Sequence, residues 1–306
     1  MSFFSPPQNI ATEVYASLPD RYRRDRRSDW ADANKGGAVV DSFLEGPSFD
    51  REGNLYVVDI PFGRVFRVDP DRTWSVVTEY EGWPNGLKIR RDGRIFITDY
   101  RLGVLELNPA SGRIKPVLAN IRSEGFKGVN DLILARNGDL FFTDHGQTGL
   151  QDASGRVYRW TSDGRLDCLI DVAPGPNGIV LNGAETHLYV AMTRSCQVWR
   201  IPLTRDSRVS KAQVFVQLSG GISGPDGLAM DGQDNLLVCD PGHGSVWVFD
   251  RLGEPLYRVR SCAGLATTNL AFGGKDMREL YITESESGQI LRARMPVPGR
   301  PLVSHD

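Results

Sequence analysis

Pairs of short apolar runs recur along the chain, joined by polar turns that mostly contain glycine. The first three pairs read SFDREGNLYVVD, LKIRRDGRIFITD and LILARNGDLFFTD. Further along follow IVLNGAETHLYVAMT, LAMDGQDNLLVCD and LAFGGKDMRELYITE. Two apolar runs of this length on either side of a Gly-containing turn predict a β-hairpin. We therefore expect an all-β protein built from six related units.

An oxygen-bearing side chain stands at the head of each unit and sets the repeat. The six positions are Glu45, Asn85, Asn130, Asn177, Asp226 and Asn269. Their spacings are 40, 45, 47, 49 and 43 residues, and a period in the forties is typical of propeller blades when the units are hairpins. Six such repeats account for most of the 306 residues. The sequence predicts a single domain over residues 1–306, a six-bladed β-propeller with four-stranded blades.

The two ends of the chain supply one further strand each. Thr12 to Leu18 (TEVYASL) and Gly288 to Met295 (GQILRARM) lie outside the repeated hairpins. Pairing these terminal strands in one blade would remove two exposed sheet edges and close the ring. We expect this closure.

The repeat also predicts where chemistry takes place. Equivalent positions of successive blades surround one central channel, so the six oxygen-bearing side chains should form a ring there. Two are carboxylates, four are amides, and none is Lys or Arg. Hard divalent cations prefer such oxygen ligands, Ca²⁺ above all, with Zn²⁺, Mg²⁺ or Mn²⁺ as alternatives.

A purely structural interpretation of the same positions is open. Pro84-Asn85-Gly86, Pro176-Asn177-Gly178 and Pro225-Asp226-Gly227 are strong turn tripeptides, because Pro pre-sets φ while Asn, Asp and Gly tolerate positive φ. Turn formation explains Glu45 poorly, since Glu is not a favoured turn residue.

Residues 20–41 form an insertion before the first ring position. Its middle, RYRRDRRSDWADANKGG, mixes Arg with Asp and contains Trp30. Mixed charge of this kind indicates a solvated surface, and the alternative is a lid over the channel mouth. Loops carrying Trp83, Phe126 and Lys127 are expected at the same mouth, where they would form the rim of the pocket.

Composition limits the kinds of partner and the cellular location that we expect. A net charge of −2 and a pI near 6.1 argue against a nucleic-acid partner, which requires a basic face. No apolar run of 18 residues occurs, so no membrane span is expected. Four cysteines without a CxxC pair predict reduced thiols and a cytoplasmic location.

Several catalytic motifs are absent from the sequence. There is no GxSxG, GxGxxG, GxxxxGK[ST] or HExxH, which argues against serine-hydrolase, dinucleotide, nucleotide-triphosphate and zincin chemistry. His145 and His243 occupy equivalent positions just after the repeated strand. A satisfied structural histidine is the commoner outcome, but either would be a natural proton shuttle if it reached the channel.

The chain resembles the family of senescence marker protein, gluconolactonase and luciferin-regenerating enzyme. The motifs that carry the resemblance are Glu45-Gly46-Pro47, Gly128-Val129-Asn130-Asp131-Leu132, Pro176-Asn177-Gly178 and Pro225-Asp226-Gly227-Leu228. The resemblance implies a six-bladed propeller with one divalent metal on its axis. It further implies that Glu45, Asn177 and Asp226 bind the metal, that Asn130 faces the substrate and reaches the metal directly or through water, and that Asp226 is the usual candidate for general base.

One departure from the family concerns the substrate. Regucalcin-like members carry an Arg two residues before the substrate-facing Asn, and here that place is Gly128, with Lys127 beside it. Without that Arg, and with aromatic side chains expected at the rim, we predict a substrate that is smaller or less polar than an unprotected sugar lactone.

The activity expected from these residues is metal-assisted hydrolysis of a small-molecule lactone. The metal would polarise the carbonyl, and Asp226 or His145 would activate water. Substrate contacts are expected from Asn130, Asn85, Asn269, Lys127 and Trp83. A phosphotriesterase-like hydrolase and a non-enzymatic calcium-binding propeller are the alternatives, because fold alone does not fix function.

Overall fold

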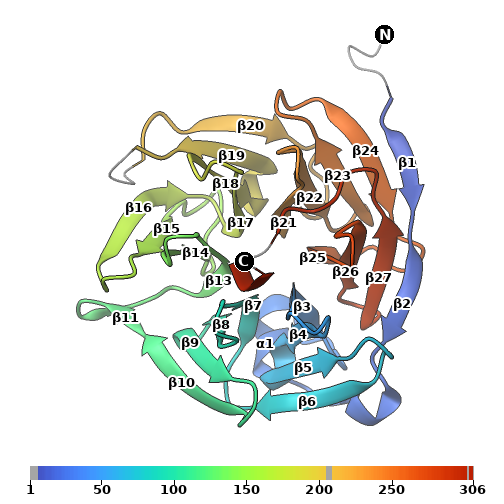
Figure 1. The fold of residues 1–306 in the computed structure, drawn as a ribbon. Helices are drawn as coiled ribbons and strands as arrows, with labels where there is room; N and C mark the ends of the chain where they lie inside the picture. Colours follow the sequence, from blue (N-terminus) through green and yellow to red (C-terminus); the bar gives the residue numbers. More distant parts are fainter. Residues whose placement is uncertain (1–5, 205–208, 302, 306) are drawn as a thin grey trace.

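Six sheets, five of four strands and one of five, stand in a ring around a central axis in the computed structural model of the chain (Figure 1). The structure describes residues 6–204, 209–301 and 303–305. Strands make up 51% of the protein and helices 6%. The predicted all-β fold, a six-bladed β-propeller with four-stranded blades, is therefore confirmed.

Each blade starts at the axis and runs outward through antiparallel neighbours, in chain order in blades 1 to 5 and with β2 as the outermost strand of blade 6. Blades 1 to 3 consist of β3 (Leu44–Phe49), β4 (Leu55–Asp59), β5 (Arg64–Val68) and β6 (Trp74–Glu79); β7 (Pro84–Ile89), β8 (Ile95–Asp99), β9 (Gly103–Asn108) and β10 (Arg113–Leu118); and β13 (Val129–Leu134), β14 (Leu140–Asp144), β15 (Gly155–Trp160) and β16 (Leu166–Ala173). A short hairpin, β11 (Asn120–Ile121) with β12 (Glu124–Gly125), lies between blades 2 and 3.

The remaining blades follow the same plan. They consist of β17 (Pro176–Leu181), β18 (His187–Met192), β19 (Gln197–Pro202) and β20 (Gln213–Gln217); β21 (Leu228–Met230), β22 (Leu236–Asp240), β23 (Ser245–Phe249) and β24 (Pro255–Arg260); and β25 (Thr267–Gly273), β26 (Glu279–Glu284), β27 (Gln289–Arg294) and β2 (Glu13–Ser17).

The ring closes through the two ends of the chain, as predicted. Strand β2 pairs antiparallel with β27, so that Glu13 lies opposite Arg292 and Ser17 opposite Gln289. The sequence did not predict the second closure: β1 (Gln8–Ala11) adds to blade 5 as a parallel partner of β24. The N-terminal segment therefore fastens two adjacent blades.

Apolar side chains fill the space between neighbouring blades. One cluster joins Leu44 and Val57 of blade 1 to Ala271 and Tyr281 of blade 6. Another joins Phe141 of blade 3 to residues of β17 and β18 in blade 4. The inward-facing residues of each hairpin thus bury themselves against the next blade, which explains why the strands are apolar on both faces.

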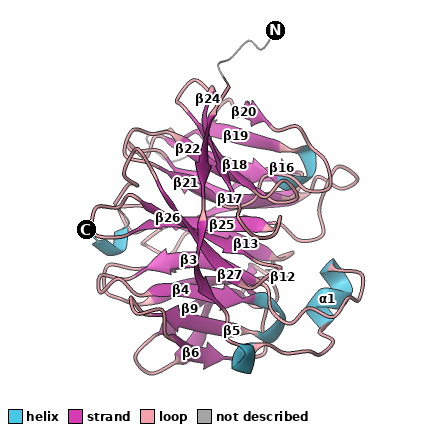
Figure 2. Cartoon of the chain, turned by 90° about the vertical axis from the view of Figure 1, so that its right-hand side faces the viewer, coloured by secondary structure: helices cyan, strands magenta, loops and turns pink. Residues whose placement is uncertain are grey.

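The insertion at residues 20–41 covers part of one face. It contains η1 (Asp20–Tyr22) and α1 (Asp29–Asn34), and Ser28 caps α1 by accepting a hydrogen bond from the Ala31 N–H at 3.2 Å. Trp30 is only 7% exposed and packs on Phe43 with ring centroids 4.8 Å apart. Helix α1 lies on one face of the ring, whereas η4 (Val303–His305) near the C-terminus lies on the other (Figure 2).

Two further observations bear on the predictions from composition. In the ranges that the structure describes, no helix is long and apolar enough to cross a membrane. Cys168, Cys196, Cys239 and Cys262 form no disulfide bond.

Candidate active site

The six ring positions lie at the start of the innermost strands, not in turns. Five are residues of β3, β7, β13, β17 and β25, and Asp226 precedes β21 by two residues. In those five strands the pairing with the second strand shifts register at the ring position. Such bulges re-aim a side chain and are frequent beside active sites. The interpretation of the Pro-Asn-Gly tripeptides as turns is therefore wrong.

The glycine that follows four of the ring residues allows the blades to approach one another. A Cβ atom at Gly46 would lie 2.7 Å from the carbonyl oxygen of Asn85, and one at Gly86 would lie 2.8 Å from that of Asn130. A Cβ atom at Gly178 would likewise clash with the Asp226 carbonyl oxygen, and one at Gly227 would clash with Asn269. Any side chain at these positions would push adjacent ring residues apart.

Hydroxyl side chains at the ends of second strands fix the ring backbone of the following blade. Thr98 Oγ1 donates to the Asn130 carbonyl at 2.5 Å, and Thr143 Oγ1 donates to that of Asn177 at 2.8 Å. Ser285 Oγ holds the Leu44 carbonyl at 2.6 Å, next to Glu45. These bonds explain the recurring threonine that precedes the acid at the end of the repeated phrase.

The acid beside that threonine holds the loop that leads into its own blade. Asp59 Oδ1 accepts the Phe43 N–H at 2.7 Å, Asp144 Oδ1 accepts that of Gly128 at 2.7 Å, and Glu284 Oε1 accepts that of Ala266 at 2.8 Å. Each of these loops delivers a ring residue to the channel. The repeated acids are therefore structural parts of the site.

Glu45 and Asp226 come within electrostatic reach of each other. Burial raises the pKa of Glu45 to about 7, while hydrogen bonds from Thr268, Gly46 and Asn269 oppose the shift. Burial also raises the pKa of Asp226 well above its usual value, and the charges of Glu45 and Asp131 raise it further. Glu45 is only 3% exposed, and a hydrogen bond with Asn177 favours the ionised form of Asp226. Four residues of the predicted site thus interact: Glu45, Asn177, Asp226 and Asn269.

His145 lies beside the start of β17. Its ring hydrogen-bonds the backbone of Pro176. Because proline has no N–H, the ring must donate this bond to the carbonyl. Nδ1 is buried and has no hydrogen-bond partner in the described chain, so the proton resides on Nε2 and Nδ1 is an acceptor. Burial and the charge of Arg194 lower the pKa of His145 to about 4, which keeps the ring neutral at pH 7.

Arg194 is a functional candidate that sequence reasoning missed. It lies in η3 (Thr193–Ser195) after β18, and its charge acts on both Asp226 and His145. A cavity of about 410 Å³ is lined by Arg194 and His145 together with Asn34 from α1, Gln147 and Gln151. The insertion therefore contributes to the wall of the same cavity as the histidine.

The remaining predicted contacts lie in various surroundings. Asn130 is buried and Asn85 half-buried at their ring positions. Lys127 is exposed, and its Nζ donates to Ser154 Oγ at 2.6 Å.

Trp83 is half-buried and packs against the cluster of Trp30, Ala31, Phe43 and Ile60. His243 hydrogen-bonds Asp240 through Nδ1 at 3.2 Å.

Phe126 does not line the mouth, contrary to expectation. Its ring packs edge-on against Phe142 and Tyr158 at 5.5 and 5.4 Å, inside the apolar cluster of blade 3. At Gly128 a Cβ atom would lie 2.5 Å from the ring of Tyr100, and φ is +153°. The aromatic side chain beside this glycine is therefore Tyr100, whose ring leaves no room for an Arg.

A family model described as SMP-30/Gluconolactonase/LRE-like region matches residues 43–286. The chain belongs to this family. The gluconolactonase of Zymomonas mobilis is 28% identical over 283 residues, which cover 82% of this chain and 78% of that protein. The diisopropyl-fluorophosphatase of Loligo vulgaris is 28% identical over 277 residues, covering 80% and 87%.

Solved structures share the fold of this family member. Regucalcin from Agrobacterium tumefaciens, described as a calcium-binding protein, superposes with a TM-score of 0.78 at 20% identity, covering 98% of this chain and all of the other. XC5397 from Xanthomonas campestris, described as a gluconolactonase, gives a TM-score of 0.74 at 23% identity, covering 95% and 99%.

The ring is chemically suited to a divalent cation. In the described ranges no three His, Cys, Asp or Glu side chains form a metal-binding group, but the ring pairs two carboxylates with amides. Glu45 is buried and Asp226 half-buried; both have raised pKa values, and neither makes a close ion pair with Lys or Arg in the described chain. Carboxylates withdrawn from water require a compensating charge, and a dication bound by oxygen ligands would supply it.

Asp131 is the second residue that sequence reasoning left out of the site. It follows Asn130, where four of the other five units have glycine, and it is only 2% exposed. Burial raises its pKa, while the charge of Lys88 and a hydrogen bond with Asn269 lower it. The available signal was the departure from Asn-Gly to Asn-Asp in one repeat.

Proposed function

We propose that this protein is a metal-dependent hydrolase of lactones, with its metal on the propeller axis. The observation that carries the proposal is the pair of carboxylates at the ring, the buried Glu45 and the half-buried Asp226, whose charges act on each other and which make no close ion pair with a basic side chain in the described chain. Glu45, Asn130, Asn177 and Asp226 would hold the ion, for which Ca²⁺ is the favoured candidate. Relatives that are named gluconolactonase and lactonase support the reaction class.

A bound dication would supply Lewis-acid polarisation of the ester carbonyl. The protein contributes orientation and proton transfer. The bulged strands hold the side chains of Asn130 and Asn177 at the mouth, while Asn85 and Asn269 are candidates to orient substrate oxygens. His145 Nδ1 is the accepting atom for a proton from water, and Asp226 is the alternative base.

The protonation states leave two bases in competition. Nδ1 of His145 is unprotonated and unpartnered in the described chain, so it can accept a hydrogen bond from water, but a pKa of about 4 makes the ring a weak base. A carboxylate that binds a dication is also a weak base, so both His145 and Asp226 stay candidates for this step. Arg194, beside His145, would stabilise negative charge that develops on the substrate.

The side chains that line the cavity favour a substrate with polar substituents. Asn34, Gln147, Gln151 and Arg194 provide amide and guanidinium groups, whereas Phe126 is turned into the blade. This departs from our expectation of an apolar rim. We therefore propose a lactone that carries hydroxyl or carboxylate groups, bound beneath the insertion, which we propose acts as a lid.

A phosphotriesterase-like activity is the second candidate, because the family includes the squid diisopropyl-fluorophosphatase. The test compares turnover of δ-valerolactone, gluconolactone and paraoxon by protein treated with EDTA and then given Ca²⁺, Zn²⁺, Mg²⁺ or Mn²⁺. We expect lactone turnover that disappears with EDTA and returns with one of these ions. Faster turnover of paraoxon would favour the second candidate.

Three variants test the roles of the residues. Asp226→Asn should lose at least 100-fold in kcat and bind metal more weakly, whereas His145→Gln should lose kcat and keep its metal. Glu254→Gln, an exposed acid on an outer turn, is the matched control and should behave as wild type. Unchanged metal content and turnover in both Asp226→Asn and Glu45→Gln would overturn the assignment.

A further inference from the structure

A second pocket lies on the propeller axis at the mouth opposite to the oxygen ring. All six innermost strands contribute to its wall, through Ser48, Lys88, Leu134, Leu181, Met230 and Phe272. These residues follow the ring positions by three or four places in each strand, which corresponds to about 10 to 13 Å along an extended chain. The pocket is therefore separate from the candidate metal site, at the other end of the same channel.

The C-terminal segment forms one side of this pocket. The Arg300 N–H bonds the Met230 carbonyl at 3.3 Å, and its guanidinium donates to the carbonyls of Leu181 and Gly183 at 3.1 and 2.9 Å. Pro301 and Val303 add apolar surface. Arg300 thus fixes the chain at the far mouth through bonds to blades 4 and 5.

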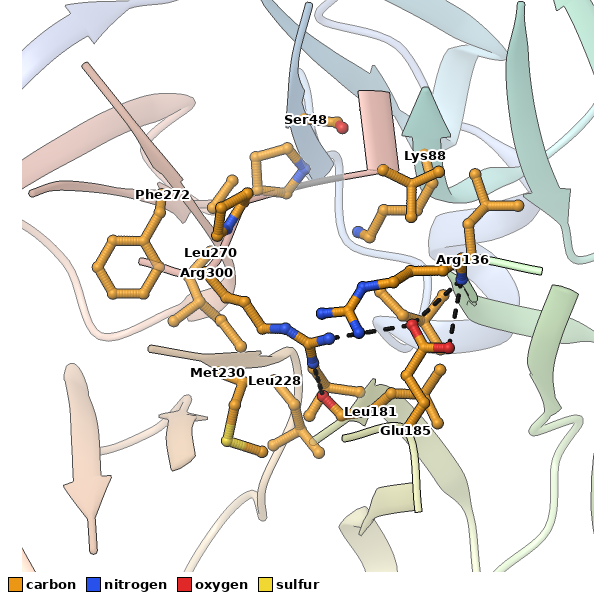
Figure 3. Close-up of a pocket in the computed structure, with 18 residues that line it drawn as sticks. Ser48, Lys88, Arg136, Leu181, Glu185, Leu228, Met230, Leu270, Phe272 and Arg300 are labelled. Atoms are coloured by element: carbon orange, nitrogen blue, oxygen red, sulfur yellow. Dashed lines mark hydrogen bonds and ion pairs between the residues drawn. The ribbon is translucent and has the colours of Figure 1, made fainter. Parts of the chain in front are cut away.

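Three cationic side chains and one carboxylate face the pocket. In the close-up, Lys88, Arg136 and Arg300 all extend toward its middle (Figure 3). The carboxylate of Glu185 is already engaged, because it accepts the Arg136 backbone N–H at 3.1 and 3.3 Å and lies 3.9 Å from Arg300 Nη2. The pocket therefore carries an excess of positive charge.

Lys88 and Arg136 have charged groups to offer a ligand. Within the described ranges, neither the Lys88 ammonium nor the Arg136 guanidinium makes a hydrogen bond or a close ion pair. Lys88 is half-buried in the channel wall, and Arg136 extends over the mouth from the turn after β13. The charge of Lys88 also acts on the buried carboxyl of Asp131. Two cations that make no hydrogen bond or close ion pair and that converge from different blades form a site for an anion.

The rest of the wall selects among anions. Most lining residues are aliphatic or aromatic, including Leu228, Met230, Leu270 and Phe272. The volume of the pocket is about 90 Å³, roughly three times the volume of one water molecule in the liquid. An apolar wall favours burial of hydrocarbon over hydration, so a fully polar anion such as phosphate fits poorly.

We propose that this far-mouth pocket binds a small organic carboxylate, with its carboxylate between Lys88 and Arg136 and its short hydrocarbon chain against Leu270 and Phe272. The proposal concerns a second site and goes beyond the lactone hydrolysis proposed for the other mouth. It requires neither metal nor turnover.

Calorimetric titration of the full-length protein with sodium butyrate tests the proposal, with butyramide as the neutral isostere and inorganic phosphate as the polar anion. We expect saturable butyrate binding that is at least tenfold tighter than binding of either alternative. No saturation by butyrate, or equal binding of butyramide, would overturn the proposal. Tighter binding of phosphate would overturn the choice of an organic ligand.

Substitutions locate the binding. Lys88→Met and Arg136→Gln should each weaken butyrate at least tenfold. Arg113→Gln, on the exposed outer strand β10, is the control and should bind as wild type. Because Arg136 is exposed, its substitution leaves the core intact even if Lys88→Met fails to fold. Wild-type affinity in Arg136→Gln would contradict the proposal.

A spectroscopic readout separates this site from the other mouth. In protein with ¹³C-methyl methionine, butyrate should shift the signal of Met230, which lines the pocket, and leave that of Met192, buried between blades 3 and 4, in place. A shift at Met192 without one at Met230 would place the ligand elsewhere. No lactone is present, so the result is independent of the proposed hydrolysis.

Discussion

Glu45 and Asp226 are 181 positions apart in the sequence, and each raises the energetic cost of the other's charge. Asn177 and Asn269 hydrogen-bond these carboxylates but bring no compensating charge. Because burial disfavours ionised groups, the pair is poised to exchange protons for a cation. Metal binding and protonation should therefore compete at the same oxygens.

This competition predicts a pH dependence of metal affinity. The pKa of Glu45 is raised to about 7, so the carboxylate is ionised above pH 7 and becomes protonated as the pH falls through that value. A ligand must be deprotonated to bind metal, and the pKa of Asp226 is raised as well, so affinity for Ca²⁺ should fall at least about tenfold per pH unit below 7. Calorimetry at pH 8, 7 and 6 measures this slope.

Glu45→Gln is the control for that slope. It should bind Ca²⁺ more weakly at every pH, with a smaller change between pH 8 and 6. Wild-type affinity that stays constant over this range would contradict the competition.

The repeat predicted the ring residues, but not all the side chains around them. Equivalence between blades depends only on counting along the sequence, which is how Glu45 and Asn177 were identified. Arg194 lies in a 3-10 turn without an equivalent in the repeated phrase, and its direction depends on local geometry that sequence patterns do not encode. Phe126 was misassigned for the same reason, because a loop aromatic can turn toward the channel or into its own blade.

Among the elements, the innermost strands combine a bulge with an anchored backbone. Thr143 at the end of β14 shows how: its Oγ1 accepts the Asp131 N–H at 3.1 Å and donates to the Asn177 carbonyl at 2.8 Å. One hydroxyl thereby links blade 3 to blade 4 directly behind the site. The site geometry thus depends on contacts between strands, not only on its own side chains.

Removal of that hydroxyl should be costly. Thr143→Val keeps the shape but leaves a buried N–H and a buried carbonyl without their partner, at about 1 to 3 kcal/mol each. We expect the free energy of unfolding to fall by about 2 to 4 kcal/mol, measured by urea denaturation. Thr143→Ser, which keeps the hydroxyl, should lose much less, and equal stability of the Val variant and wild type would contradict this role.

The closing strands can be tested in the same way. Deletion of residues 1–18 removes β1 and β2 and leaves β24 and β27 as open edges. Exposed edges pair with other chains, so we expect aggregation, detected by light scattering. Glu13→Gln, which removes only the ion pair with Arg292, should stay monodisperse, and a soluble, fully active deletion variant would contradict the prediction.

Strand positions were predicted well because hairpin turns and apolar runs are local signals. The antiparallel closure by β2 followed from the need to cover edges. The parallel addition of β1 to blade 5 was not predictable. This strand has only four residues, QNIA, and so short a sequence carries no pattern that distinguishes one sheet edge from another.

The whole molecule is asymmetric along its axis. One mouth holds the carboxylates, His145, Arg194 and the insertion, and the other holds Lys88, Arg136 and the C-terminal segment. Figure 2 shows α1 and η4 on opposite faces. Ligands of different charge should therefore be directed to different ends of one channel.

Substrate preference should reflect the first of these mouths. If Arg194 and the amides bind polar substituents, gluconolactone should exceed δ-valerolactone in kcat/KM by at least tenfold, about 1.4 kcal/mol of transition-state preference. Arg194→Gln should reduce that ratio while leaving δ-valerolactone nearly unchanged. A preference for δ-valerolactone in the wild-type protein would instead support the less polar substrate first expected from the sequence.

The closure of blade 6 by strands from both ends also has a consequence for biosynthesis. The four proposed metal ligands come from blades 1, 3, 4 and 5, and their spacing is fixed only when the ring is complete. A nascent chain that has not yet emerged as far as β27 cannot pair β2 in its native place. We therefore expect that the cation binds late, after β27 has emerged and paired with β2, and that it fastens a ring already closed instead of guiding its assembly.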